Sequence, residues 1–174
     1  MYPTPAPGWM ACAGAPLDLP AAGYQLSHHP GWPCASAAWR RREYLRQALA
    51  HGCPLYLSAI VASEFQVGQA VTDLPLRNFH VLPFNIDHAM TAGNFMRALQ
   101  RDPADDRVAV KDDIKLLAQM ACESISHILT EDANTLVKYL DRLRGRALLD
   151  AQAIVLAQGF DMSWFQGGQR PLLD

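Results

Sequence analysis

The chain has 174 residues, which on a prior of roughly 150 residues per domain corresponds to about one domain. Half of the residues are apolar, and 15 Lys and Arg against 17 Asp and Glu give a net charge of −2. This balance excludes a global basic field of the kind that attracts nucleic acid, but not a local basic patch. No apolar run reaches the roughly 20 residues that a membrane helix needs, so we expect no membrane association.

The four cysteines and six histidines do not follow metal-ligand spacings. The sequence contains no C-x-x-C pair and no H-x-x-x-H pair, so neither a structural zinc site nor a zinc-protease helix is expected. Four cysteines in a chain of this length also do not suggest a disulfide framework. We therefore expect free thiols and a cytoplasmic location.

Residues 1–37 differ in composition from the rest of the chain. They hold 7 of the 12 prolines and a single charged residue, Asp18. The prolines interrupt any helix or strand period, and the segment lacks the basic start and continuous apolar core of a secretory signal. We expect residues 1–37 to be irregular and residues 38–174 to form the folded domain. A functional extension and a misassigned start are both compatible with this segment.

From residue 38 onward, short apolar runs alternate with segments of helical periodicity. This alternation predicts an α/β domain with a central parallel sheet and helices on both faces. Ser58 and Asn85 are suited to cap the helices that follow them. The predicted strands are 55–57, 80–84, 107–110 and 127–129, and the predicted helices are 38–50, 60–68, 86–96, 111–121 and 136–143. Weaker apolar patterns lie at 147–149 and 160–164, and the predicted core includes Val61, Leu117, Leu129 and Leu140.

Acidic residues at the strand-to-helix junctions are the candidate functional residues, because ligands of a parallel α/β sheet bind outside the carboxyl ends of its strands. The candidates are Glu64, the Asp112–Asp113 pair and Asp132. Each has a structural alternative: Glu64 could reach water from the edge of an apolar stripe, and the aspartates could cap helices. Carboxylates gathered at one sheet edge repel one another, so together they favour a site for Mg²⁺ or Mn²⁺. Without the metal, this repulsion should raise the pKa of at least one of these carboxyl groups.

Four segments occur in an order that resembles a PIN domain, namely LSAIVASEFQVG (57–68), LPFNID (82–87), VKDDIKLLA (110–118) and ILTED (128–132). PIN domains are small metal-dependent nucleases, and many are VapC-type toxins of bacterial toxin–antitoxin pairs. The resemblance covers about residues 42–145. It implies a PIN-like three-layer α/β/α fold with a central parallel sheet, and an acidic pocket that binds Mg²⁺ or Mn²⁺.

The resemblance also implies roles for individual residues. Glu64, Asp113 and Asp132 match the family's metal-binding acids, with Asp112 as the alternative to Asp113 in a shifted register. Thr130 matches a hydroxyl residue that helps to hold a carboxylate or a metal-bound water.

One departure from the family concerns the first strand. In PIN domains this strand ends in an Asp-Thr-Asn-like motif, whose aspartate is a principal metal ligand, and the present chain has no such motif. Asp18 is a tentative substitute, although Pro20 and the lack of an apolar strand before it count against it. We therefore expect the first strand to be missing or degenerate.

The function implied by the resemblance is metal-dependent hydrolysis of RNA, leaving a 5′-phosphate and a 3′-hydroxyl, by a toxin with a small antitoxin partner and a homodimeric state. Candidate contacts to the RNA backbone are Arg107, Lys111 and Lys115, with a solvated helix start as the alternative. Candidate apolar interface residues are Leu45, Leu49 and Phe65, with plain core as the alternative. The competing interpretation is a catalytically impaired PIN-like binding module that lacks the first metal-ligand aspartate.

Overall fold

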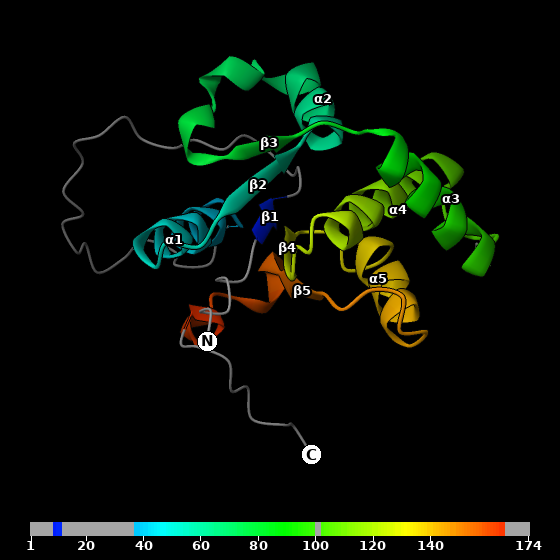
Figure 1. Ribbon diagram of the computed structural model, residues 1–174. Coiled ribbons are helices and arrows are strands. Elements are labelled where there is room, and N and C mark those ends of the chain that lie inside the picture. The colour runs from blue at the N-terminus through cyan, green and yellow to red at the C-terminus, as the bar shows by residue number, and fades with distance from the viewer. Residues whose placement is uncertain (1–8, 12–36, 100–101, 166–174) are drawn as a thin grey trace, which may run out of the picture.

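The computed structural model describes residues 9–11, 37–99 and 102–165. Its centre is a sheet of five parallel strands in the order β3-β2-β1-β4-β5, with helices on both faces (Figure 1). The strands are β1 Trp9–Ala11, β2 Leu55–Ser58, β3 His80–Leu82, β4 His127–Thr130 and β5 Gln152–Val155. The α-helices are α1 Ala37–Ala50, α2 Ala59–Gly68, α3 Ile86–Ala98, α4 Arg107–Cys122 and α5 Leu136–Arg144. The predicted α/β class with a parallel sheet is confirmed.

Strand β1 occupies the middle of the sheet. Trp9 pairs with Leu55 of β2 on one side and with His127 of β4 on the other. The prediction that residues 1–37 are irregular is therefore wrong for Trp9–Ala11. Of the two alternatives for the first strand, missing or degenerate, the first is wrong, because a strand of three residues without an acid is present. Three residues are too few to show a period in the sequence, and hydrogen bonds to two neighbouring strands define this strand instead.

Helix α4 begins earlier than predicted. Residues 107–110 were expected as a strand, but they form the first turn of the helix. The carboxylate of Asp106 caps this turn by accepting hydrogen bonds from the amides of Val108 and Ala109, at 2.8 and 2.9 Å. Asp112 and Asp113 consequently lie in the second turn of α4, not at the end of a strand or the opening of a helix.

The other predicted helices occur close to their expected bounds, and both predicted caps are present. The Ser58 hydroxyl accepts from the amide of Ile60 at 3.1 Å, and the Asn85 side chain accepts from the amide of His88 at 3.0 Å. Strand β5 was not predicted. It is defined by its hydrogen bonds to β4, which no local sequence pattern shows. Among the described helices, none has the length and apolar character needed to cross a bilayer.

Buried side chains form two clusters. In β4, Ile128 joins the first cluster and Leu129 the second, because successive side chains of a strand point to opposite faces of the sheet. The first cluster contains the buried faces of α2, α3, α4 and α5, and the second contains that of α1. All four residues predicted for the core, Val61, Leu117, Leu129 and Leu140, are buried.

Candidate functional site

Four carboxyl groups from three separate segments influence one another electrostatically. Asp113 of α4 feels the charges of Asp132, in the loop after β4, of Glu64 on α2, and of its neighbour Asp112. Glu64 in turn feels the charge of Asp112. The tertiary structure therefore brings together acids that are up to 68 positions apart in the sequence, from Glu64 to Asp132. This group is hereafter called the acidic site.

Asp113 is the most perturbed carboxyl group of the acidic site. Burial raises its pKa to about 6, the nearby Thr135 hydroxyl opposes this rise, and the charges of Asp132, Glu64 and Asp112 add to it. Its Oδ2 atom is buried and has no hydrogen-bond partner among the described residues. A raised carboxyl pKa was expected from like-charge repulsion. The direction is confirmed, but the larger cause is burial.

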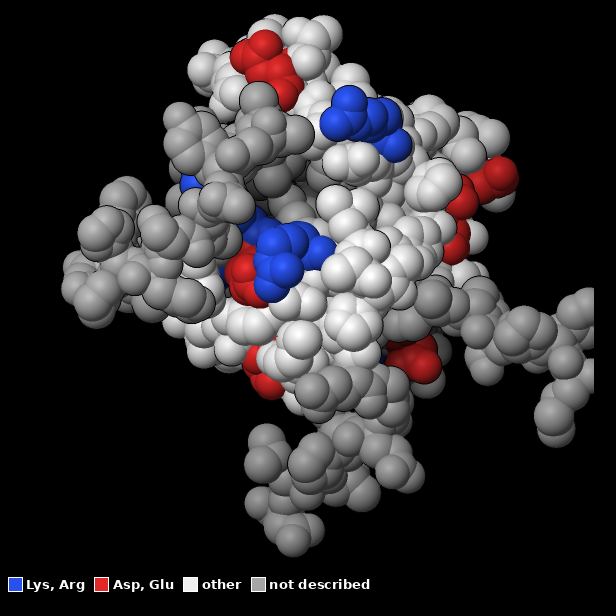
Figure 2. Space-filling model, turned by 90° about the vertical axis from the view of Figure 1, so that its left-hand side faces the viewer, with Lys and Arg blue, Asp and Glu red and all other residues white. Residues whose placement is uncertain are grey.

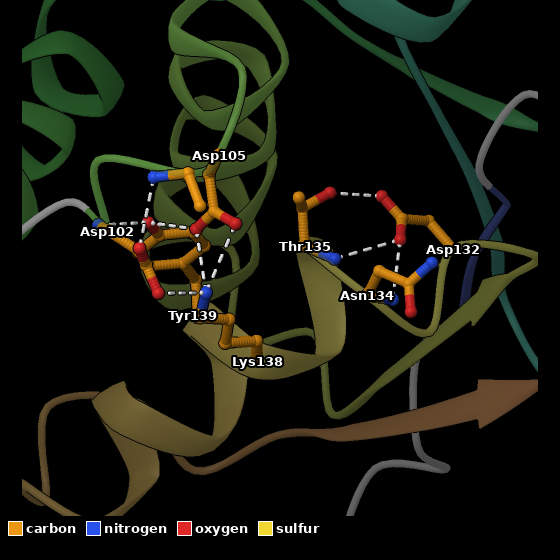
Figure 3. A network of polar contacts seen from close by, with 8 residues as sticks. Asp102, Asp105, Asp132, Asn134, Thr135, Lys138 and Tyr139 are labelled. Atoms are coloured by element: carbon orange, nitrogen blue, oxygen red, sulfur yellow. Dashed lines mark hydrogen bonds and ion pairs between the residues drawn. The ribbon is translucent and has the colours of Figure 1, made fainter.

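Asp132 is held by hydrogen bonds from the start of α5 (Figure 3). Its Oδ1 atom accepts from the amides of Asn134 and Thr135, at 2.7 and 2.9 Å, and its Oδ2 atom accepts from the Thr135 hydroxyl. Burial disfavours ionisation of Asp132, but these hydrogen bonds outweigh it and lower the pKa. Asp132 therefore orders the turn that precedes α5, whose N-cap residue is Thr135, and its charge also acts on Asp113.

The PIN resemblance assigned to Thr130 a hydroxyl that helps to hold a carboxylate. In the structure, Thr130 and Thr135 both form hydrogen bonds with Asp132, one with its backbone and the other with its carboxylate. The Thr130 hydroxyl is buried and accepts a hydrogen bond from the amide of Asp132 at 2.9 Å, so it orients the loop backbone. Thr135 is the residue whose hydroxyl holds the carboxylate. Sequence reasoning missed Thr135. A threonine just before a helix is a common N-cap signal, but here its hydroxyl makes no capping hydrogen bond and donates to Asp132 instead.

The cations expected to contact RNA differ in their surroundings. Lys115 forms an ion pair with Asp112, with 2.7 Å between Nζ and Oδ1, so this lysine partly neutralises the acidic site. Arg107 and Lys111 are exposed on the first turns of α4. This exposure is consistent with the alternative interpretation, a solvated helix start. A contact of these two residues to RNA remains a prediction.

The donor atoms of the acidic site bear on whether a divalent cation fits there. Within the described residues, no group of three or more His, Cys, Asp or Glu side chains could hold a metal ion as the side chains stand. The convergence of Glu64, Asp113 and Asp132 on one ion therefore remains a prediction. The Asp113 Oδ2 atom is nevertheless buried without a partner and is surrounded by carboxylates. Because Mg²⁺ binds through one or two carboxylates and keeps several waters, this donor set fits such an ion.

A second polar network involves α5 and the loop that leads into α4, and Figure 3 shows it together with the contacts of Asp132. The Lys138 ammonium contacts Asp102 and Asp105, each at 2.9 Å, and the Tyr139 hydroxyl donates to Asp105 at 2.7 Å. The amide of Asp102 donates to the same hydroxyl at 3.1 Å. The network joins α5 to the loop that leads into α4, and so fixes the helix of Asp113 relative to the segment of Asp132.

Helix α1 carries four arginines along its length. Arg41 is buried and lies 3.3 Å from a carboxylate oxygen of Glu131, which immediately precedes Asp132. Arg46 pairs with Glu43 on the same helix. In Figure 2 the described Lys and Arg side chains of that face form separate groups, one of which has Asp or Glu side chains directly beside it. Arg41 is thus a buried cation paired with the residue before Asp132, and the sequence did not single it out.

The remaining predicted residues lie elsewhere or have another role. Asp18 lies outside the described residues. Leu45 is 3% exposed and belongs to the second buried cluster, Phe65 is partly buried against the first cluster, and Leu49 is 47% exposed. An interface built on Leu45 is therefore wrong, because this side chain has no surface to offer a second copy.

Comparisons with protein-family models and with curated proteins give no match to this chain.

Proposed function

We propose that this protein is a metal-dependent phosphodiesterase that cleaves RNA, built on a PIN-like three-layer α/β/α fold. The observation that carries the proposal is the buried, unpartnered Oδ2 atom of Asp113 among the carboxyl groups of Asp132, Glu64 and Asp112. A buried charged oxygen without a partner is costly, and the described residues place no donor on this atom, so a bound cation would compensate its charge.

Two further observations support this function. The acids come from the β4–α5 loop and from α2 and α4, which follow or precede the strands of a parallel sheet, as at the ligand-binding edge of α/β folds. The sheet order β3-β2-β1-β4-β5 also accommodates the four segments on which the PIN resemblance rests.

Asp113 and Asp132 would hold Mg²⁺ or Mn²⁺ in this site, with Glu64 and Asp112 binding its waters. The ion supplies Lewis acidity, which makes water a better nucleophile near neutral pH and offsets charge on the phosphate. Thr135 keeps the Asp132 carboxylate in one orientation. The raised pKa of Asp113 means that this residue reaches its anionic, ligand form only above about pH 6 until a cation is present.

The partners proposed with this activity are a single-stranded or looped RNA substrate, a small antitoxin protein and a second copy of the chain. They rest on the PIN resemblance. A small antitoxin would cover the acidic site, and a basic side chain is the group best suited to neutralise four neighbouring carboxyl groups.

A second candidate is a PIN-like binding module without nuclease activity. The observation that favours it is the composition of β1, the central strand, in which Trp9, Met10 and Ala11 supply no carboxylate to the sheet edge where the family has its first aspartate.

The deciding experiment is cleavage of labelled RNA with Mn²⁺, with and without a chelator, by the wild-type chain, Asp113→Asn and Asp141→Asn. Asp141 is an exposed aspartate on α5 and provides the matched control. We expect chelator-sensitive cleavage by the wild type and by Asp141→Asn, and loss of cleavage in Asp113→Asn. Equal cleavage by all three proteins would refute the site, and RNA binding without cleavage by the wild type would favour the binding module.

A further inference from the structure

The side chain of Gln119 on α4 is completely buried and links three elements of the fold. Its Oε1 atom accepts a hydrogen bond from the Ser58 hydroxyl at 2.6 Å. Its Nε2 atom donates to the carbonyl oxygens of Leu82 and Pro83, at 3.4 and 3.2 Å. Gln119 thus joins α4 to the carboxyl ends of both β2 and β3.

Ser58 extends this chain of hydrogen bonds into α2. It is completely buried, and the hydroxyl that donates to Gln119 also accepts from the amide of Ile60, so it caps the helix that carries Glu64. Each group in the chain donates in one direction and accepts from the other, and such chains are mutually strengthening in a low-dielectric interior. The Ser58–Gln119 hydrogen bond, hereafter called the tie, therefore holds the start of α2 against one residue of α4.

The positions of the acids follow from this tie. Glu64 lies six residues after Ser58, and Asp113 lies six residues before Gln119. At a rise of about 1.5 Å per residue, each acid lies about 9 Å along its helix from the Ser58–Gln119 hydrogen bond. The two helices thus carry their acids at equal distances from the shared tie, and the carboxyl groups of Glu64 and Asp113 interact across the gap between them.

We propose that Gln119 is a positioning residue of the acidic site, which sets the spacing between α2 and α4 and hence between Glu64 and the Asp112–Asp113 pair. The effect of Gln119 on metal binding rests on the proposed function. Its effect on the spacing between α2 and α4 does not depend on that function. Groups that orient metal ligands from outside the first shell typically change metal affinity by about 10–100-fold when they are removed.

Gln119→Met is the main test variant, because it keeps the length of the side chain and removes both hydrogen-bonding groups. Ser58→Ala removes the same tie from the α2 side. Tyr44→Phe is the matched control, since it loses hydrogen bonds to Gly159 and Asp161 that hold α1 to the C-terminal segment.

The first measurement is the distance distribution between spin labels on Val67 of α2 and Val108 of α4, both exposed, by double electron–electron resonance in the full chain without metal. The labels are attached to ketone-bearing amino acids, so that the four cysteines stay unchanged. We expect a shifted or broadened distribution in Gln119→Met and in Ser58→Ala, and the wild-type distribution in Tyr44→Phe. Wild-type distributions in both test variants would overturn the positioning role.

The second measurement is the Kd for Mn²⁺ of the same proteins. We expect it to rise by about tenfold in Gln119→Met and to stay unchanged in Tyr44→Phe. If the distances change but the wild type binds no Mn²⁺, the positioning role stands and the proposed metal-dependent function fails. If the distances change and the wild-type Mn²⁺ affinity persists in Gln119→Met, the spacing does not govern the site, and the positioning role is refuted.

Discussion

Asp113 and Asp132 interact through their charges, and yet the pKa of Asp113 is raised while that of Asp132 is lowered. The difference lies in their hydrogen bonds: Asp132 accepts from two amides and the Thr135 hydroxyl, whereas the Oδ2 atom of Asp113 is buried with no partner among the described residues. Of the two, Asp113 is the one whose charge is incompletely compensated, and a cation would affect it most.

The stability of the protein should respond to pH through Asp113. The folded-state pKa of about 6 exceeds the ordinary value of 3.8, so the folded chain binds this proton more tightly and loses stability as the pH rises from about 4 to about 6. Relative to the wild type, Asp113→Asn should gain about 1–2 kcal/mol over that range, after allowance for the partial exposure of the group. Urea unfolding at a series of pH values measures this difference, with Asp141→Asn as the control. A pH-independent difference would contradict the burial of an uncompensated charge at Asp113.

Divalent cations should stabilise the folded chain. At 100 times the Kd, a ligand that binds only the folded state adds about 2.7 kcal/mol. We expect Mg²⁺ or Mn²⁺ to raise the Tm in a concentration-dependent and chelator-reversible manner, and Asp113→Asn to lose this response. NaCl at matched ionic strength is the control for a non-specific effect of ionic strength on the Tm. A wild-type Tm that Mg²⁺ and Mn²⁺ leave unchanged would remove the metal from the proposal.

Thr135→Val should destabilise the protein by about 1 kcal/mol near neutral pH, because a charged acceptor loses its hydroxyl donor. The lowered pKa of Asp132 stabilises the fold above the ordinary aspartate range and is lost as the pH falls through the folded-state value. The difference between Thr135→Val and the wild type should therefore shrink below about pH 4. Chemical unfolding at pH 7 and pH 3 tests this, with the exposed Thr72→Val as the control. An equal difference at both pH values would show that lost packing, not the hydrogen bond, is responsible.

The helix layer that carries the acidic site should depend on Leu140, which is completely buried on α5. Leu140→Ala should cost about 2–5 kcal/mol, the usual range for a buried leucine that leaves a cavity. Leu148→Ala is the matched control, because Leu148 is 43% exposed and its loss should cost less than about 1 kcal/mol. Similar midpoints of urea unfolding for the two variants would contradict the packing of α5.

The sequence by itself determined the elements whose signals are local. Ser58 and Asn85 cap helices through atoms two or three residues away, and the 3.6-residue period of α5 places Leu140 in the core without reference to the rest of the chain. The four acids of the candidate site were also named in advance from their sequence positions. For Asp112 and Asp113 the reason was wrong, because they follow the first turn of α4 and not a strand.

The tertiary structure alone decided what depends on distant partners. Trp9–Ala11 becomes the central strand because β2 and β4 supply hydrogen bonds on its two sides, more than forty and more than one hundred residues away in the chain. The start of α4 was misread because Val108 and Val110 alternate like a strand, while the carboxylate of Asp106 decides for a helix. The pKa of Asp113 and the tie between Ser58 and Gln119 arise from burial and contacts across elements, which no local pattern encodes.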